Sequence, residues 1–450
     1  MAAGTRRSGP TPREPRGSRS NDDRDSGHDY GHDGGRDAGH GHGHGPATAA
    51  SARLRTIVTM ILVPLAGAAL VGLAMLWPSN THPATPPSEK GLTYVQGTVV
   101  AEQTVPCGTG ATTPTSTACT QVTVRITSGP TIGKTVNLVV GQDATTPKYS
   151  PGDRLSLRYS PTTVPGTTAD SQYSIHDFQR GPPLASLAIA FAIFVVIIGR
   201  WRGFAAVTAL GASFLLLVKF MLPAILDGEN AVLVAAVTAT VILFIALYST
   251  HGLSVRTSVA VLGSGLSLAL IAGLGSISVQ LAHITGLGTE DAQVAAGLFH
   301  QIDVRGLLLA GVIIGALGVL DDVTITQVSS VWELKRADPE MEFAELFGAG
   351  MRIGRDHIGS TINTLVLAYA GAALPLLVVV STSGAGWSTA ASSEVVAEEL
   401  IRTLIGSIGL VAAVPLTTAL AAAIAGTERR AGTERRAGTE RRAGRARRYR

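Results

Sequence analysis

The sequence predicts an α-helical polytopic membrane protein of about eight transmembrane helices, with a small extracytoplasmic β domain between the first and second helices. Three observations support this. Charged residues make up only 15% of the 450 residues, well below the usual quarter. Apolar residues make up 46%, and they gather into long blocks. This composition excludes a soluble enzyme, a disordered protein and a nucleic-acid reader built on a basic domain.

The net charge of +4 is distributed unevenly along the chain. Residues 1–55 carry +2, residues 426–450 carry +7, and the remainder carries −5. The two tails are therefore basic and the body is mildly acidic. Nucleic acid is not an expected partner, because no folded basic domain is predicted.

The N-terminal segment 1–55 is predicted to be a disordered cytoplasmic tail. Imidazoles spaced along a flexible chain can chelate Ni²⁺, Zn²⁺ or Cu²⁺, and a solvated tail without metal is the favoured alternative. The histidines concerned are His28, His32, His40, His42 and His44. The apolar stretch 56–77 that follows lacks a clear small-residue cleavage site, so we expect a retained signal-anchor helix.

Residues 78–181 are predicted to form the β domain. Runs such as Gln121–Ile126 alternate in polarity or are β-branched, and Gly-Pro and Pro-Gly turns separate them. Four or five strands of this length suggest a small barrel, which could be OB-like, or an open sandwich. Cys107 and Cys119, the only two cysteines of the sequence, both lie here. On the oxidising side of a membrane they predict a disulfide, and a zinc pair is less favoured because no histidine lies close in sequence.

Eight stretches are long and apolar enough to cross a bilayer. The hydrocarbon core is about 30 Å thick and needs about 20 mostly apolar residues as helix. The stretches are 56–77, 184–199, 204–222, 231–249, 258–283, 306–326, 361–380 and 401–424. The last seven predict a helical bundle over 182–424, with a cytoplasmic loop at 327–360.

Basic residues in short loops indicate orientation, because they are enriched on the cytoplasmic side. With eight spans, most of the basic residues near the span ends fall on one side of the membrane, together with both tails. The residues on that side are Arg53, Arg55, Arg200, Arg202, Arg256, Lys335, Arg336, Arg352 and Arg355. Both termini are therefore predicted to be cytoplasmic. The Ala-, Gly- and Arg-rich composition, without an organelle-targeting signal, favours a bacterial plasma membrane.

The C-terminal segment 425–450 contains three copies of Gly-Thr-Glu-Arg-Arg-Ala. Six residues are too few for a folded repeat, so we expect a disordered basic cytoplasmic tail. Its arginines would be attracted to anionic lipid by about 1 kcal/mol each near the surface.

The clearest candidate for chemistry is the pair Asp321 and Asp322 in the stretch 306–326. Asp322 lies about 24 Å along a helix that begins at Gly306, hence inside the hydrocarbon region. An ionisable group there costs at least about 2.5 kcal/mol. Carboxylates beside Thr326 and Gln327 could handle a proton or a cation. The alternative is a helix end whose acids bond backbone or pair with basic residues such as Lys335 and Arg336.

The phase of the neighbouring residues predicts a packing seam. At 100° per residue, Gly311, Gly315, Gly318 and Asp322 fall in one stripe. Small residues at this spacing let another helix approach closely, so we expect the carboxylate to be sheltered by sister helices. Asn363, which precedes Pro375 in the next stretch, is a further candidate, although a hydrogen-bonded helix contact is the favoured interpretation.

The stretch 315–334, which includes Leu-Asp-Asp-Val and Ser-Ser-Val-Trp-Glu-Leu, resembles the YibE/F family of bacterial membrane proteins. The resemblance covers about 184–424 and extends to the overall plan of one N-terminal span, an extracytoplasmic β-rich segment and a multi-span bundle. The family implies a polytopic plasma-membrane protein and supplies no reaction or substrate.

Two functions follow as hypotheses. The first is a transporter or permease for a small solute or ion, coupled through the intramembrane aspartates. The second is a non-transporting scaffold whose outer β domain binds an envelope component or protein partner. The sequence has no nucleophile elbow, HExxH, Walker A or ABC signature, so an enzyme is not expected, and an intramembrane hydrolase is the least favoured function. A homo-oligomer is compatible with either.

Overall fold

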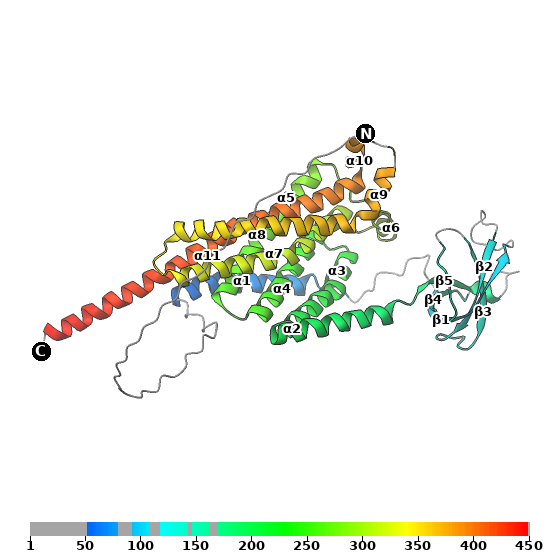
Figure 1. Cartoon of the computed structure of the whole chain (residues 1–450), viewed down its shortest axis with the longest axis horizontal. Helices are drawn as coiled ribbons and strands as arrows, with labels where there is room; N and C mark the ends of the chain where they lie inside the picture. Colours follow the sequence, from blue (N-terminus) through cyan, green and yellow to red (C-terminus); the bar gives the residue numbers. More distant parts are fainter. Residues whose placement is uncertain are drawn as a thin grey trace, which may run out of the picture. The chain divides into compact units, whose positions relative to one another are not determined.

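The computed structural model describes residues 52–79, 92–107, 118–142, 146–161, 169–382, 384 and 386–448 (Figure 1). The predicted histidine tract of the N-terminal tail lies outside these residues. The described residues form a small β domain and a set of long apolar helices.

The β domain is one five-stranded antiparallel sheet with the order β3-β2-β1-β4-β5. The strands are β1 (Thr93–Pro106), β2 (Ala118–Ile126), β3 (Thr135–Gly141), β4 (Arg154–Tyr159) and β5 (Tyr173–Phe178). The first half of β1 pairs with β4 and its second half pairs with β2. Because β1 belongs to both pairs and carries a bulge between Val99 and Ala101, the sheet curls into a half-barrel.

The inner face of the half-barrel is the hydrophobic core of the domain. Alternate residues on each strand are buried there, as the period of two requires: Val95, Val99, Val122, Val124, Val136, Leu155 and Leu157. The short 3₁₀ helix η2 (Ala169–Gln172) helps to close the open side, since the Asp170 carboxylate accepts a hydrogen bond from the Asn137 amide at 3.1 Å. The five strands form one curled sheet, so of the two predicted architectures the domain is a half-barrel and not a sandwich of two sheets.

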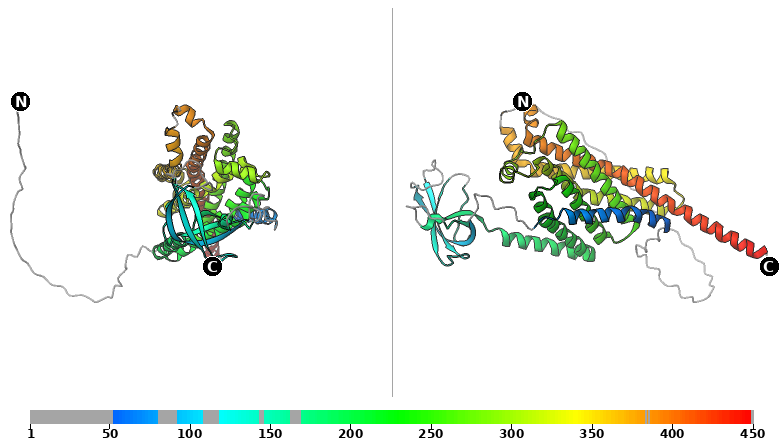
Figure 2. Two further views of the ribbon diagram at one scale, coloured as in Figure 1. Left: turned by 90° about the vertical axis from the view of Figure 1, so that its right-hand side faces the viewer. Right: turned by 180° about the vertical axis from the view of Figure 1, so that it is seen from behind.

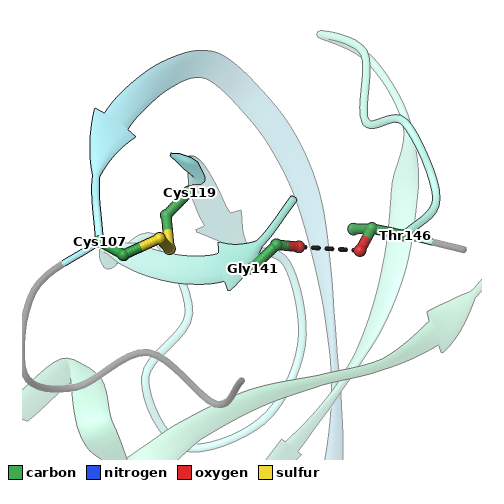
Figure 3. The surroundings of a disulfide bond; sticks show 4 residues. All are labelled: Cys107, Cys119, Gly141 and Thr146. Atoms are coloured by element: carbon green, nitrogen blue, oxygen red, sulfur yellow. Dashed lines mark hydrogen bonds between the residues drawn. A yellow bond between two sulfur atoms is a disulfide. The ribbon is translucent and has the colours of Figure 1, made fainter. Parts of the chain in front are cut away.

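Cys107 and Cys119 form a disulfide at the end of the β1–β2 hairpin, with Cα atoms 5.0 Å apart (Figure 3). Beside it, the Thr146 hydroxyl donates to the Gly141 carbonyl oxygen at 2.8 Å. The bond closes a 12-residue separation. A loop of that size stabilises the fold by about 3 kcal/mol in the chain-entropy model.

The helices follow the apolar stretches of the sequence. They are α1 (Ala52–Met75), α2 (Gly181–Leu216), the π-helical turn η3 (Leu217–Met221), α3 (Leu222–Leu226), α4 (Ala231–His251), α5 (Val255–Leu281), α6 (Glu290–Leu298), α7 (Val304–Ala337), α8 (Phe343–Ala372), α9 (Leu374–Thr382), α10 (Trp387–Ala391) and α11 (Glu394–Arg448). In the described part of the chain, six helices are long and apolar enough to cross a membrane, or seven if α8 and α9 form one bent span.

Two breaks decide how these helices are divided. The continuous stretch 181–226 spans 46 residues, but Arg200 has φ 53° and ψ −130°, so the stretch is two helices joined at that residue. Helices α8 and α9 meet at 63° beside Pro375. A proline has no N–H and its ring clashes with the preceding turn, so it bends the chain there.

Two segments predicted to lie outside the membrane spans are largely helical in the structure. The segment 327–360 is mostly helical, because α7 continues to Ala337 and α8 begins at Phe343, capped by a reciprocal Glu342–Glu345 capping box. The backbone of the basic tail continues α11 as a helix to Arg448, where disorder was expected. Alanine, glutamate and arginine are good helix formers, which gives that segment a helical preference.

Helix α7 lies at the centre of the bundle and packs against α4, α5, α8 and α11 (Figures 1 and 2). Its buried face contributes Ala310, Ile313, Leu317, Leu320 and Val328 to the largest core cluster. By contrast, large apolar side chains of α2 such as Leu187, Phe194 and Ile197 are exposed. Such a surface is stable in contact with lipid rather than water, which fits a membrane protein.

Candidate functional site

The candidate site lies on α7, where the apolar helix gives way to polar residues. Asp321, Asp322, Thr324, Thr326 and Gln327 follow one another within two turns. Successive residues on a helix point 100° apart, so these five side chains divide between different faces of α7. The structure places two of them in the core and two at the surface.

The core of the site contains an interhelical contact between hydroxyl groups. The side chains of Ser264 on α5 and Thr324 on α7 are both fully buried, and their oxygens are 2.7 Å apart. Thr324 also lies one turn after Asp321, whose carbonyl oxygen accepts from the Thr324 hydroxyl at 3.3 Å. The contact between Ser264 and Thr324 therefore holds this face of α7, which also carries Asp321, against α5.

Gln327 connects three helices. Its amide nitrogen donates to the Gly350 carbonyl oxygen of α8 at 2.8 Å and to the Thr418 hydroxyl of α11 at 2.7 Å. The side chain is 4% exposed. Its amide therefore holds α7, α8 and α11 together, which makes Gln327 a packing residue rather than a ligand.

Glycines on α8 make that approach possible. A Cβ built on Gly354 would lie 2.4 Å from a Val414 methyl carbon and 3.1 Å from the Gln327 side-chain oxygen. Gly350 and Gly354 are four residues apart and face the same way, which is the spacing of small residues that lets helices pack closely in membranes. A close helix–helix seam of this protein therefore lies on α8.

Asp321 has the least satisfied polar group of the site. Its side chain is half-buried, and its Oδ1 atom is enclosed with no hydrogen-bond partner among the described residues. An enclosed carboxylate oxygen without a donor is costly in a low-dielectric environment. A proton or a cation bound there would remove that cost.

Asp322 corrects the prediction of a sheltered glycine seam. Its side chain is exposed, and so are Gly311, Gly315 and Gly318. Cβ atoms built on Gly311 and Gly318 would meet nothing within 4 Å, and one on Gly315 would meet only the Tyr369 hydroxyl. The stripe shares one face as expected, but among the described residues its glycines meet another helix only at Gly315, beside the Tyr369 hydroxyl of α8. The reason is that the opposite face of α7, with its larger apolar residues, supplies the core.

The remaining candidate residues, Thr326 and Asn363, do not form a polar cluster with Asp321. Thr326 is exposed on the glycine side of α7, and Asn363 is exposed on α8, away from the buried face that contains Gly350 and Gly354. Among the described residues, no group of three or more His, Cys, Asp or Glu side chains is arranged to hold a metal ion.

Sequence reasoning missed the residues that α5 and α11 contribute. Ser264, Thr417 and Thr418 are fully buried hydroxyl residues, and Pro415 lies beside the two threonines inside α11. Proline has no N–H, so the carbonyl oxygen of Val411 loses its usual helical donor. A proline followed by two hydroxyl residues in an apolar span was the signal that could have identified this part of the site.

Comparison with known families supports the resemblance noted from the Leu-Asp-Asp-Val segment. The YibE/F-like protein family matches residues 187–427, which is more than half of the chain. Comparisons with curated proteins and with solved structures gave no match. The match runs from within α2 to within α11 and includes every residue of the candidate site. The chain therefore belongs to the YibE/F-like family.

Proposed function

We propose that this protein is a multi-pass plasma-membrane transporter or permease for a small solute or ion, with Asp321 as its coupling group. The observation that supports this is the enclosed Asp321 Oδ1 without a hydrogen-bond partner among the described residues, at the end of the apolar part of α7. Ionisable groups at such positions most often belong to substrate or ion pathways and proton relays.

The topology that we propose has eight spans. It divides the stretch 181–226 at Arg200 and counts α8 with α9 as one span. Arg200, Arg256, Lys335 and Arg336 then fall on one side with both termini, which the positive-inside rule assigns to the cytoplasm. The 46 residues of the divided stretch would measure about 69 Å as one helix, more than twice the bilayer core, so two spans fit better.

A path for a proton would run from Asp321 to the nearby polar groups. Asp322 is the next residue and is exposed, and His251 at the end of α4 lies within electrostatic reach of both Asp322 and Arg202. In this proposal Asp321 takes up a proton, and Asp322 and His251 pass it to the cytoplasmic side. The carboxyl group returns to its starting state when the proton leaves.

The test is proton flux into proteoliposomes that contain the purified protein, a trapped pH-sensitive dye and an imposed potassium diffusion potential. Asp321→Asn should lower the initial rate at least tenfold, because the amide cannot take up the proton. Glu333→Gln is the matched control, since Glu333 is a carboxylate on the same helix that pairs with Arg256 and Arg336 at 3.4 Å. Equal fluxes from wild type and Asp321→Asn would contradict the proposal.

A scaffold function is the second candidate. The β domain has its own hydrophobic core and a disulfide, as a separately folded binding module would, and this favours the scaffold function. If the protein is a scaffold, Asp321→Asn should leave the cellular phenotype of the wild type unchanged, whereas deletion of residues 92–178 should abolish it. The reverse pattern would favour transport.

A further inference from the structure

The convex face of the β domain carries three arginines that no described carboxylate neutralises. We define this arginine face by Tyr94, Thr98, Arg125, Arg154, Arg158 and His176. Arg125 on β2 and Arg154 on β4 lie directly opposite Thr98 on β1, one on each side. Residues opposite each other project from the same face of a sheet, and both arginines are exposed. With strands about 4.8 Å apart, their Cα atoms are about 10 Å apart.

A second row extends the face by four residues along β1. Arg158 lies opposite Tyr94, and its Nε atom is enclosed without a hydrogen-bond partner among the described residues. The exposed ring of Tyr94 contacts His176 of β5, with ring centres 4.9 Å apart. Tyrosine side chains with an apolar ring and a polar tip are enriched at the headgroup level of membranes.

No carboxylate of the described domain forms an ion pair with Arg125, Arg154 or Arg158. Asp153 accepts from the Ser150 amide at 2.7 Å, and Asp170 accepts from the Asn137 amide. Asp177 lies opposite Ser156 of β4, hence on the arginine face. It pairs there with a fourth arginine, Arg180, at 2.5 Å, and this hydrogen bond is the main reason that the pKa of Asp177 is lowered. Glu102 lies opposite the buried Val122, hence on the other face. The arginine face therefore keeps its positive charge.

The chain itself places this face close to a bilayer. The Gln179 amide donates to the Arg154 carbonyl oxygen at 2.8 Å, so Gln179 continues the row of Arg125, Thr98 and Arg154. The first long apolar helix after the domain, α2, begins two residues later at Gly181. Two residues span at most about 7 Å. The row of arginines consequently ends where the chain enters the membrane.

We infer that the arginine face docks on the phosphate headgroups of anionic lipids in the leaflet that α2 enters. Arginine matches phosphate oxygens with two parallel hydrogen bonds, and unpaired arginines at a membrane surface are attracted by its negative charge. This inference rests on the proposed membrane insertion of α2 and is independent of transport through Asp321. It assigns the β domain a membrane-bound position above the bundle.

The test uses the full-length protein in nanodiscs. Both cysteines of the sequence form the disulfide, so a cysteine introduced by Gln96→Cys is the only free thiol and can carry a fluorophore. Gln96 is exposed on the arginine face, and Gln103, exposed farther along β1, is the reference position for Gln103→Cys. Lipids with a quencher on the headgroup report how close each label lies to the bilayer.

The label at position 96 should be quenched more strongly than the label at 103, and only in discs that contain phosphatidylglycerol in addition to phosphatidylcholine. Each arginine should contribute about fivefold to the ratio of docked to undocked protein, the equivalent of about 1 kcal/mol. The double variant R125Q/R154Q should therefore lower that ratio about 25-fold. R125K/R154K should retain most of it, because the charge remains.

Lys134→Gln is the control for net charge, because Lys134 lies over the Tyr173 ring on the inner side of the half-barrel, and it should leave quenching unchanged. Millimolar inorganic phosphate should weaken docking no more than sodium chloride of equal ionic strength. A larger effect of phosphate would show a site for free phosphate and overturn the inference. So would quenching that ignores phosphatidylglycerol or the R125Q/R154Q change. None of these outcomes depends on the proton flux measured with Asp321→Asn.

Discussion

The two faces of α7 differ in how their polar and small residues are used. On the buried face, Thr324 and Gln327 contact α5, α8 and α11, and each side chain has a hydrogen-bond partner. On the exposed face, Gly311 and Gly318 meet open space, and Asp322 is in contact with the surroundings of the chain. Small residues in a stripe therefore do not by themselves identify a helix–helix contact. The larger apolar residues on the opposite face of α7 determine which face of the helix packs into the core.

The largest expected difference between the two faces comes from adding one methyl group. Gly354→Ala should lower the free energy of unfolding by about 1–3 kcal/mol, because the new Cβ would overlap Val414 beside Gln327. Gly318→Ala should leave it unchanged or raise it by up to about 1 kcal/mol, since alanine is the better helix former and the position is open. Reversible unfolding of the purified variants in mixed SDS micelles measures both changes. A destabilised Gly318→Ala variant would show that another molecule covers that face.

A second pair of variants compares neighbours in sequence that point to opposite faces. Gln327→Leu should lower the free energy of unfolding by about 1–2 kcal/mol, because it removes two hydrogen bonds that join α7 to α8 and α11. Thr326→Val should change it by less than about 0.5 kcal/mol, as expected for a surface position. The same unfolding assay reports both values. Equal losses for the two variants would mean that the hydrogen bonds of Gln327 contribute no more to stability than the exposed side chain of Thr326.

Much of the architecture could be predicted from the sequence. The apolar stretches mark α1, α2, α4, α5, α7, α8 and α11, because about 20 apolar residues have no stable place in water. The alternation in Gln121–Ile126 predicts a strand, and it forms β2 in a half-barrel. Family membership followed from the segment around Asp321 and Asp322. These features are local in sequence, so one sequence is enough to detect them.

The parts that could not be predicted depend on the choice among alternative packings. Helical periodicity shows that Gly311, Gly315, Gly318 and Asp322 share a face, but that face could pack against protein or remain outside. Ser264 and Thr418 are 60 and 91 residues away from their partners on α7. No spacing rule relates such residues before the helices are placed. The structure gives Gln327 hydrogen bonds to two other helices and leaves Asn363 exposed on α8, and neither arrangement follows from the spacing of the residues in the sequence.

The smallest expected effect is the most specific test of the buried face. Ser264 and Thr324 share one contact of 2.7 Å between fully buried hydroxyls. Interhelical hydrogen bonds in membranes contribute only about 0.6 kcal/mol on average, because the unfolded chain also finds partners there. A double-mutant cycle with Ser264→Ala and Thr324→Val should give a coupling of that size. The cycle of Ser264→Ala with Thr326→Val should give a coupling near zero, because Thr326 is on the exposed face. Coupling of Ser264 to Thr326 rather than to Thr324 would mean that α7 is rotated in the membrane, with the glycine stripe and Asp322 turned toward α5.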